Sequence, residues 1–271
     1  MKLPMFSHTR WSDHAMCPLM YKLKSIDYAC GACKKGPIPK NSKECPFCKI
    51  ELVKPLPLER GSKFSEEIEK YLLGGDNEAW VRSFIKNDKA FIAAKQLRNA
   101  RLANPAEIQV EVSKLIHPTD KPYSMLGKMD VVTLDYTEFT AQVIDWKTGS
   151  VGKRGGLKAG SSAKYDTQLE LYAFLTMMNH PEILEVSTHL YFVDANDVGR
   201  TDRETYTRSQ LVKLAQIWIE RADKWAEDHL KENFQFSSGY WCNWCSFTFE
   251  KGGPCTVKTK KEEVNYGEAK G

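Results

Sequence analysis

The chain has 271 residues, of which 42% are hydrophobic and 27% are charged, and its formal net charge is +4. This length allows one substantial core with a small appended module, and so mild a charge does not by itself indicate a polyanionic partner. No apolar run approaches membrane-spanning length, and the segment from Met1 to His8 lacks the apolar stretch of a signal peptide. We therefore expect an intracellular, cytoplasmic protein (in a host cell if it is viral) with no membrane association.

The hydrophobic pattern predicts helices and strands in a definite order. An N-terminal helix is expected over residues 5–23, with Ser12 suited to be its N-cap. An amphipathic helix over 61–73 should end at Gly74 and Gly75. The elements expected after it are one or two helices to about residue 102, strands near 108–113, 125–134 and 141–147, a helix over 163–179, a strand over 187–193 and a helix over 207–232.

These elements suggest a division of the chain into five parts. The largest is a core with a C-terminal helix, and it is flanked by segments rich in cysteine. The expected parts are an N-terminal helix (1–23), a metal-bound insert (24–58), the core (59–236), a C-terminal cysteine segment (237–256) and a Lys/Glu-rich tail (257–271).

Four of the eight cysteines form two Cys-x2-Cys pairs with eleven residues between them, Cys30 with Cys33 and Cys45 with Cys48. Each pair lies in a turn-rich segment, and four thiolates at this spacing can close a tetrahedral zinc site. Disulfides are the weaker explanation in a reducing compartment. The spacing therefore predicts a zinc ribbon, which either stabilises a short excursion or contacts DNA or another protein.

The segment from Val143 to Gly149 places an acid and a base on one side of a predicted strand. Side chains alternate along a strand, so Asp145 and Lys147 point the same way and Trp146 points the other way. Such a pair can hold a divalent metal and an attacking water against a phosphodiester, although a surface ion pair is the common alternative. A second strand-like run, from Leu126 to Val132, carries one acid, Asp130.

Gln168 and Tyr172 are four residues apart in the predicted helix that follows, so they share a helix face. The resulting order is a strand with Asp130, a strand with Asp145-x-Lys147, and a helix with Gln168 and Tyr172. It resembles the RecB-type branch of the PD-(D/E)XK nucleases, whose motifs run G-x-x-D, D-x-K-[TS]-G and Q-x-x-x-Y. This resemblance implies an α/β fold with an αβββαβ restriction-endonuclease-like core and flanking helices.

The resemblance also implies roles for these residues. Asp130 and Asp145 would bind Mg²⁺ or Mn²⁺ with the carbonyl of Trp146 as a third ligand, and Lys147 would orient the water or neutralise developing charge. Gln168 and Tyr172 would position the substrate or Lys147. A structural role, with a core tyrosine and a surface glutamine, is the alternative for this last pair.

Two further acids are candidates because of the same resemblance. Relatives carry a metal-binding histidine in the helix after Gly61, in a G-x-x-x-H-x-x-x-E pattern, but this chain has Ser65 at that position. Glu69 matches the acid one turn later, and either Glu66 or Glu69 could supply the missing ligand because both lie on helix faces near Ser65. Glu111 lies on the first strand, where relatives often carry an acid that faces the site. A solvated acidic helix face is the alternative for Glu69.

The remaining cysteines also match the family. Cys17 lies in a Cys-Pro-x-x-Tyr segment near the start, and Cys242, Cys245 and Cys255 lie near the end. Exonucleases associated with helicases or with CRISPR systems place one cysteine and three cysteines there and bind a [4Fe-4S] cluster with them. The gap of nine residues before Cys255 is longer than the family pattern, and a second zinc is the alternative.

The overall expectation is a metal-dependent DNA nuclease, more specifically an exonuclease that acts on ends or single strands in recombination, repair or DNA processing. A glycine-rich loop is expected to contact the DNA backbone. A helicase or recombination protein is the expected class of protein partner. A DNA-binding protein whose catalysis has lapsed and an RNA-directed nuclease stay open as alternatives. The cations of the loop segment are Lys153, Arg154, Lys158 and Lys164.

Overall fold

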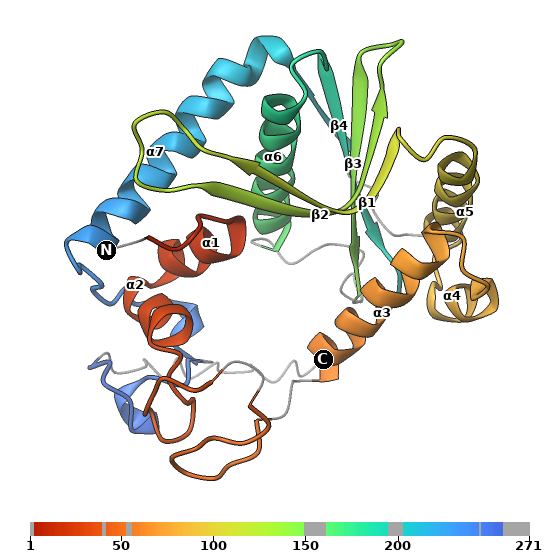
Figure 1. Cartoon of the computed structure of the whole chain (residues 1–271). Coiled ribbons are helices and arrows are strands. Elements are labelled where there is room, and N and C mark those ends of the chain that lie inside the picture. Colours follow the sequence, from red (N-terminus) through yellow and green to blue (C-terminus); the bar gives the residue numbers. More distant parts are fainter. Residues whose placement is uncertain are drawn as a thin grey trace, which may run out of the picture. The chain divides into compact units, whose positions relative to one another are not determined.

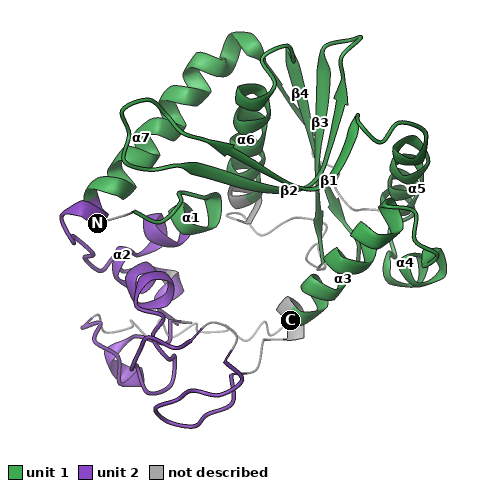
Figure 2. Cartoon of the chain, viewed as in Figure 1, with its two compact units in different colours: residues 1–11, 54–227 green, residues 12–53, 228–271 purple. Residues whose placement is uncertain are grey.

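The structure, a computed structural model, describes residues 3–39, 42–52, 56–148, 161–194, 203–243 and 245–256, with only the backbone described at 56–58, 161–164, 203 and 240. The chain divides into two compact units, residues 1–11 with 54–227 and residues 12–53 with 228–271 (Figure 2). The division into five parts stays a prediction. Within the described ranges, no helix is both long and apolar enough to cross a membrane.

A five-stranded mixed sheet forms the centre of the first unit, with its strands in chain order (Figure 1). The first three strands form an antiparallel meander of β1 (Ile108–Ile116), β2 (Met125–Asp135) and β3 (Thr140–Lys147). β4 (Glu185–Phe192) runs parallel to β3, and β5 (Arg203–Thr207) runs antiparallel to β4. A parallel neighbour requires a crossover connection, and α6 (Ser161–Asn179) lies in that connection.

Helices cover both faces of this sheet (Figure 1). One face packs against α3 (Leu56–Leu72), α4 (Glu78–Phe84) and α5 (Asp88–Ala103), and the other packs against α6. The core on the first face joins Phe64, Ile68 and Tyr71 of α3 to Val131, Ile144 and Trp146 of the strands. Burial of these apolar side chains is the main force that fixes α3 against the sheet.

The start of the chain is attached to the same unit. The backbone of Phe6 bonds to β2 through the N–H of Leu126 and the carbonyl of Ser124, at 2.8 Å in both cases. Its ring lies edge-on to Trp218 and Trp225 of α7 (Leu211–Leu230), with centroids 6.3 and 5.6 Å apart. These aromatic contacts hold the N-terminal segment between β2 and α7.

The αβββαβ order predicted from the sequence is confirmed, and three local expectations were wrong. Residues 203–207 form β5, and the helix expected from 207 begins only at Leu211, because five mostly polar edge-strand residues lack an apolar alternation. The N-terminal helix is divided into α1 (His8–Met16) and α2 (Pro18–Tyr21), because Pro18 has no N–H and the residue before it is extended. Ser12 lies inside α1 and is not its N-cap.

A glycine sets the distance between β2 and α6. A Cβ atom at Gly127 would meet Leu175 Cδ1 at 2.7 Å and Tyr172 Cδ1 at 3.1 Å. Both neighbours are buried, so neither side chain has room to move away. The close approach that glycine permits therefore brings Tyr172 next to the strand that carries Asp130.

The second unit consists of segments from both ends of the chain. His14 Nε2 lies 3.2 Å from Asp228 Oδ2, and the Tyr21 hydroxyl lies 3.2 Å from His229 Nε2. The backbone N–H of Leu19 donates to the carbonyl of Gln235 at 3.1 Å. These polar contacts connect the segment around Cys17 to the segment that leads to the C-terminal cysteines.

Candidate active site and cysteine sites

The pairing of β2 with β3 ends one residue short of each candidate aspartate. Their pairing runs from Asp135 opposite Thr140 to Val131 opposite Ile144, and it does not include Asp130 or Asp145. The backbone N–H of Trp146 instead donates to Asp130 Oδ2 at 2.7 Å. The Asp130 carboxylate therefore takes the place of a ladder partner between the two diverging strands.

The alternation expected for β3 is present. Asp145 and Lys147 form an ion pair on one side of the strand, and their side chains are 4% and 23% exposed. Trp146 faces the other way, is buried in the core beneath α3, and stacks on Tyr191 with centroids 5.0 Å apart. One short strand thus presents two charged groups while its other side is fixed by the core.

Glu111 and Glu69 lie near the same aspartates. The register of β1 with β2 is continuous on both sides of Glu111 and Asp130 but omits that pair, and Glu111 has a φ of 51°. The pKa of Glu111 is raised by partial burial and by the negative charges of Glu69 and Asp145. A non-glycine residue at positive φ is strained, and such strain is often found at functional positions.

The electrostatics of this group indicate excess negative charge. Burial and the neighbouring Asp145 raise the pKa of Asp130 to about 7. Burial acts to lower the pKa of Lys147, but the charges of Asp145 and Asp130 outweigh it, so the pKa is raised and the ammonium stays protonated. Lys147, together with Lys128 near Glu111, does not balance the four carboxylates of Asp130, Asp145, Glu111 and Glu69, whose hard oxygen donors suit a divalent cation such as Mg²⁺ or Mn²⁺.

Gln168 and Tyr172 lie side by side on α6, as their spacing predicted. Gln168 Nε2 donates to the Tyr172 hydroxyl at 2.7 Å. The pKa of Tyr172 is raised by burial and by the charge of Asp145, which places the phenol close to the carboxylates. This pair therefore forms the α6 side of the candidate site.

Ser65 lies on α3, one turn before Glu69, where relatives of the resembled branch have a histidine. A Cβ atom at Gly61, one turn earlier, would lie 3.3 Å from Thr148 Oγ1, so this helix approaches the end of β3 closely. Ser65 has only a neutral hydroxyl. Glu69, whose charge acts on Glu111, is the α3 acid that lies near the carboxylates, whereas Glu66 on the same helix is exposed.

Tyr165 lies near Lys147 but was not among the site residues predicted from the sequence. Lys147 Nζ lies 5.4 Å from the centre of the Tyr165 ring. This is a cation–π contact that no sequence motif indicates. Lys153, Arg154 and Lys158, with the side chain of Lys164, lie outside the described residues.

The first cysteine set has the geometry of a single-ion site. The ligand atoms of Cys30, Cys33, Cys45 and Cys48 all lie within 4.8 Å of one another. Two Sγ–Sγ distances, Cys30–Cys48 and Cys33–Cys45, are 3.8 and 3.7 Å. Zn–S bonds of 2.3 Å in a tetrahedron give an edge of ~3.8 Å, so the four thiols fit a zinc ion.

The second cysteine set surrounds Cys245. Its pKa is raised by burial and also by the charges of Cys17, Cys255 and Cys242, so the three other thiols lie near it. A backbone bridge between Thr248 and Cys255 returns the chain to this place after the nine-residue gap. In the part of the chain that the structure describes, the four sulfur atoms of this set do not all lie within 4.8 Å of one another. They are therefore spread more widely than the sulfur atoms of the first set.

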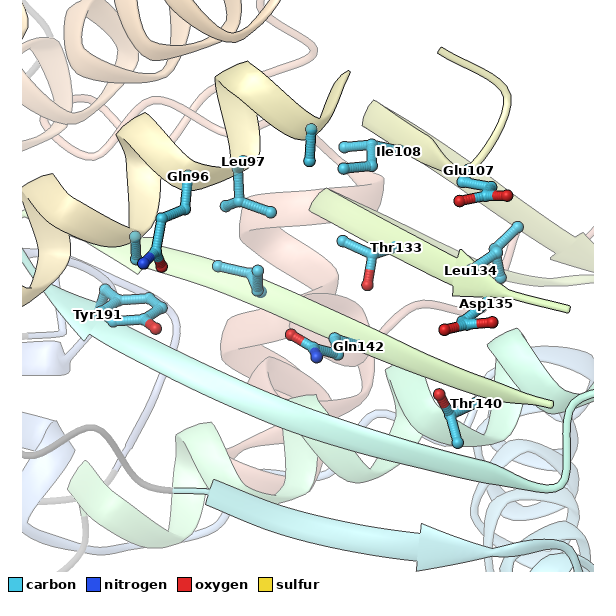
Figure 3. A pocket seen from close by; sticks show the side chains of 13 residues that line it. Gln96, Leu97, Glu107, Ile108, Thr133, Leu134, Asp135, Thr140, Gln142 and Tyr191 are labelled. Atoms are coloured by element: carbon cyan, nitrogen blue, oxygen red, sulfur yellow. The ribbon is translucent and has the colours of Figure 1, made fainter. Parts of the chain in front are cut away.

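A cavity of about 350 Å³ lies between α5 and the opposite end of the sheet (Figure 3). Its charged lining residues are Glu107 and Asp135, and its wall includes Thr133, Gln142 and Tyr191. Asp135 is five residues from Asp130 along β2, roughly 17 Å at 3.4 Å per residue. Asp135 is thus far from Asp130, and the acidic lining of the cavity disfavours a phosphate.

Solved structures that resemble this chain do so at low sequence identity. A crystal structure of an exonuclease candidate from Eubacterium rectale is 14% identical over 89% of this chain and 86% of its own, with a TM-score of 0.45. The crystal structure of SSO0001 is 15% identical over 73% of this chain and 97% of its own, with a TM-score of 0.33. Likenesses at this level do not bear on activity. A comparison with curated proteins found no match.

The family comparison is more direct, because it covers most of the chain. The sequence profile of the PD-(D/E)XK nuclease superfamily matches residues 59–249, which include the strands with Asp130, Asp145 and Lys147 and the helix with Gln168 and Tyr172. The chain belongs to the PD-(D/E)XK nuclease superfamily.

Proposed function

We propose that the protein is a Mg²⁺- or Mn²⁺-dependent deoxyribonuclease, and specifically an exonuclease that acts on DNA ends or single strands during recombination, repair or processing. The observation that supports this most is the convergence of Asp130, Asp145 and Lys147 where β2 and β3 diverge. Superfamily membership supports phosphodiester hydrolysis in general, and the DNA substrate and the pathway are our inference.

The carboxylates of Asp130 and Asp145 would hold the divalent ion, with the carbonyl of Trp146 as a third donor. When bound, such an ion lowers the pKa of a water molecule and offsets charge on the phosphate. Lys147 keeps its proton because its pKa is raised, so it acts as a fixed positive charge that orients the water and stabilises developing negative charge. It does not serve as the general base.

Glu69 and Glu111 supply the donors that a missing histidine would otherwise provide. The pKa of Glu111 is raised by burial and then by the charges of Glu69 and Asp145, so the three carboxylates lie near one another. A cation that takes up this charge gains more from two carboxylates than from the hydroxyl of Ser65. This favours an active enzyme over a DNA-binding protein whose catalysis has lapsed.

We further propose that the two cysteine sets hold different metal groups. Cys30, Cys33, Cys45 and Cys48 would bind a structural zinc ion, and Cys17, Cys242, Cys245 and Cys255 would bind a [4Fe-4S] cluster. All eight cysteines are free thiols, which suits a reducing, intracellular compartment. A helicase or recombination protein is the class of partner that would deliver DNA ends.

Replacement of the catalytic pair tests the enzyme proposal. We expect Asp145→Asn and Lys147→Ala to reduce Mn²⁺-dependent hydrolysis of labelled DNA by at least about 100-fold, because each removes charge that stabilises the transition state. Circular dichroism should show an unchanged fold. Lys213→Ala, an exposed lysine on α7, is the matched control and should keep full activity.

Full activity in both site variants would overturn the assignment of the site. If the wild-type protein binds DNA but leaves it intact with every divalent metal, the lapsed-catalysis alternative is correct. If RNA outcompetes DNA as a substrate, the RNA-directed alternative is correct.

The role of the two glutamates can be separated from general acidity of α3. We expect Glu111→Gln and Glu69→Gln to raise the Mn²⁺ concentration that gives half-maximal hydrolysis by roughly 10-fold or more, since loss of a ligand or of its support typically weakens metal binding by that factor. Glu66→Gln, on the same helix and exposed, is the control. Identical metal dependence in all three variants would show that neither glutamate takes part.

The pKa of Asp130 predicts a pH effect on the metal-free protein. Its folded pKa of about 7 exceeds the ordinary value of 3.8, so the folded state holds the proton more tightly than the unfolded state. This contribution to stability is full below about pH 4 and is lost as the pH rises to about 7. We expect Asp130→Asn to be more stable than wild type by about 2–4 kcal/mol at pH 8, and to lose that advantage at pH 4.

Chemical denaturation of wild type and Asp130→Asn in EDTA, at pH 4 and at pH 8, measures the difference in their free energies of unfolding. Parallel stabilities of wild type and Asp130→Asn across the pH range would contradict the burial and repulsion assigned to Asp130.

The optical spectrum and metal content of anaerobically purified protein test the cysteine sites. We expect one zinc and about four iron atoms per chain, with broad absorption near ~400 nm, the usual mark of a cluster. Cys245→Ser should remove the iron and the colour but keep the zinc, and Cys33→Ser should do the reverse. Colourless protein with two zinc ions would replace the cluster by the second-zinc alternative.

A further inference from the structure

The N-terminal part of α3 and the junction of α4 with α5 lie at the strand ends that carry the candidate active site. The backbone N–H of Val193, just after β4, donates to the carbonyl of Lys147 at 3.1 Å. The carbonyl of Val193 in turn accepts from the N–H of Lys86 at 2.7 Å. Arg60 of α3 forms a two-point ion pair with Asp194, the next residue. Two connections through Val193 and Asp194 thus fix cationic segments beside Lys147.

The cations of α3 lie over a layer of aromatic rings. The Arg60 guanidinium carbon is 4.5 Å from the centre of the Phe84 ring, and Lys63 Nζ is 5.9 Å from the centre of the Trp80 ring. Phe84 and Trp80 stack on each other with centroids 5.0 Å apart. Phe64 stacks on Phe84 at 4.9 Å and contacts Trp146 edge-on at 6.5 Å, so the aromatic layer continues to the catalytic strand.

Three acids of α3, α4 and α5 already have partners. Glu67 accepts from Asn77 Nδ2 at 2.7 Å, Glu78 accepts from the Tyr71 hydroxyl at 3.1 Å, and Asp88 accepts from Arg82 at 2.6 Å.

Lys63 and Lys86 are exposed, and no carboxylate of the described residues lies within 4.0 Å of either ammonium group. Within the part of the chain that the structure describes, these two cations therefore have no carboxylate counter-ion, and the Lys86 ammonium donates only to the carbonyl of Ser83.

We propose that Lys63 and Lys86 form a phosphate-binding ledge for the nucleic-acid strand that enters the active site, and that Arg60 is a positioning residue for it. This inference rests on the proposed nuclease function and names the path of its substrate. The aromatic layer limits where Lys63 can move, so less freedom is lost when it meets a phosphate. Contacts of this kind are independent of base sequence, which suits an exonuclease that must move along any strand.

The salt dependence of binding separates this role from that of two ordinary solvated lysines. Each phosphate contact made by a lysine to a single strand contributes about 0.7 to the slope of log Kd against log salt concentration. We expect Lys63→Ala and Lys86→Ala each to lower that slope by about 0.7 and the double variant by about 1.4. Lys63→Arg should restore the slope, and Lys213→Ala should keep it at the wild-type value.

Fluorescence anisotropy with a labelled single-stranded DNA oligonucleotide in EDTA measures this slope on the full chain without hydrolysis. A double variant with the same slope as wild type and Lys213→Ala would overturn the ledge, whether the lysines are merely solvated or serve a protein partner. Hydrolysis by the wild type in Mn²⁺ is assayed separately. A lowered slope without hydrolysis would keep the ledge and refute the enzyme, whereas hydrolysis with an unchanged slope would refute the ledge alone.

Discussion

Repulsion between closely placed carboxylates is the interaction on which the site depends. Asp130 occupies a gap that the β2–β3 ladder leaves open, and it is held there by the N–H of Trp146. Asp145, Glu111 and Glu69 add negative charge at the same place, and Lys147, which is half-buried and paired with Asp145, opposes it. A folded state that carries this much uncompensated charge is stabilised by protons or by a cation, and Mg²⁺ and Mn²⁺ are the cations that hard oxygen donors favour.

The same strand that presents the charges also anchors the core. Ile144 and Trp146 belong to the hydrophobic cluster beneath α3 and α5, while Asp145 and Lys147 face away from it. Loss of the alternation by a one-residue slip would bury two charges and expose two large apolar side chains, which strongly disfavours any other register. The pair Asp145 and Lys147 is therefore positioned by hydrophobic burial, and α3 is held to the same core by Phe64.

Much of this arrangement could be predicted because it rests on local patterns. Strand alternation at 143–147 and the four-residue spacing of Gln168 and Tyr172 each determine a face, and the structure has both faces as expected. Contacts that depend on the path of the chain could not be predicted. Glu111, which lies near Glu69, has a positive φ that no sequence pattern indicates. Arg60 pairs with Asp194, which is 134 residues away in the sequence. β5 could not be predicted from the hydrophobic pattern because an edge strand needs few apolar residues.

The two cysteine sets show how spacing in sequence and distance in space give different information. In the first set, Sγ–Sγ distances of 3.7 and 3.8 Å leave room for one ion and for little else. In the second set, backbone N–H groups of Ser237, Gly239 and Phe247 point at Cys17, Cys242 and Cys245 over 3.4–3.5 Å. Such N–H···S contacts stabilise thiolates without requiring the sulfur atoms to meet one another. Among the described residues, the four sulfur atoms of the second set do not all lie within 4.8 Å of one another, so this set lacks the single-ion geometry of the first although both sets have cysteine pairs of the same spacing.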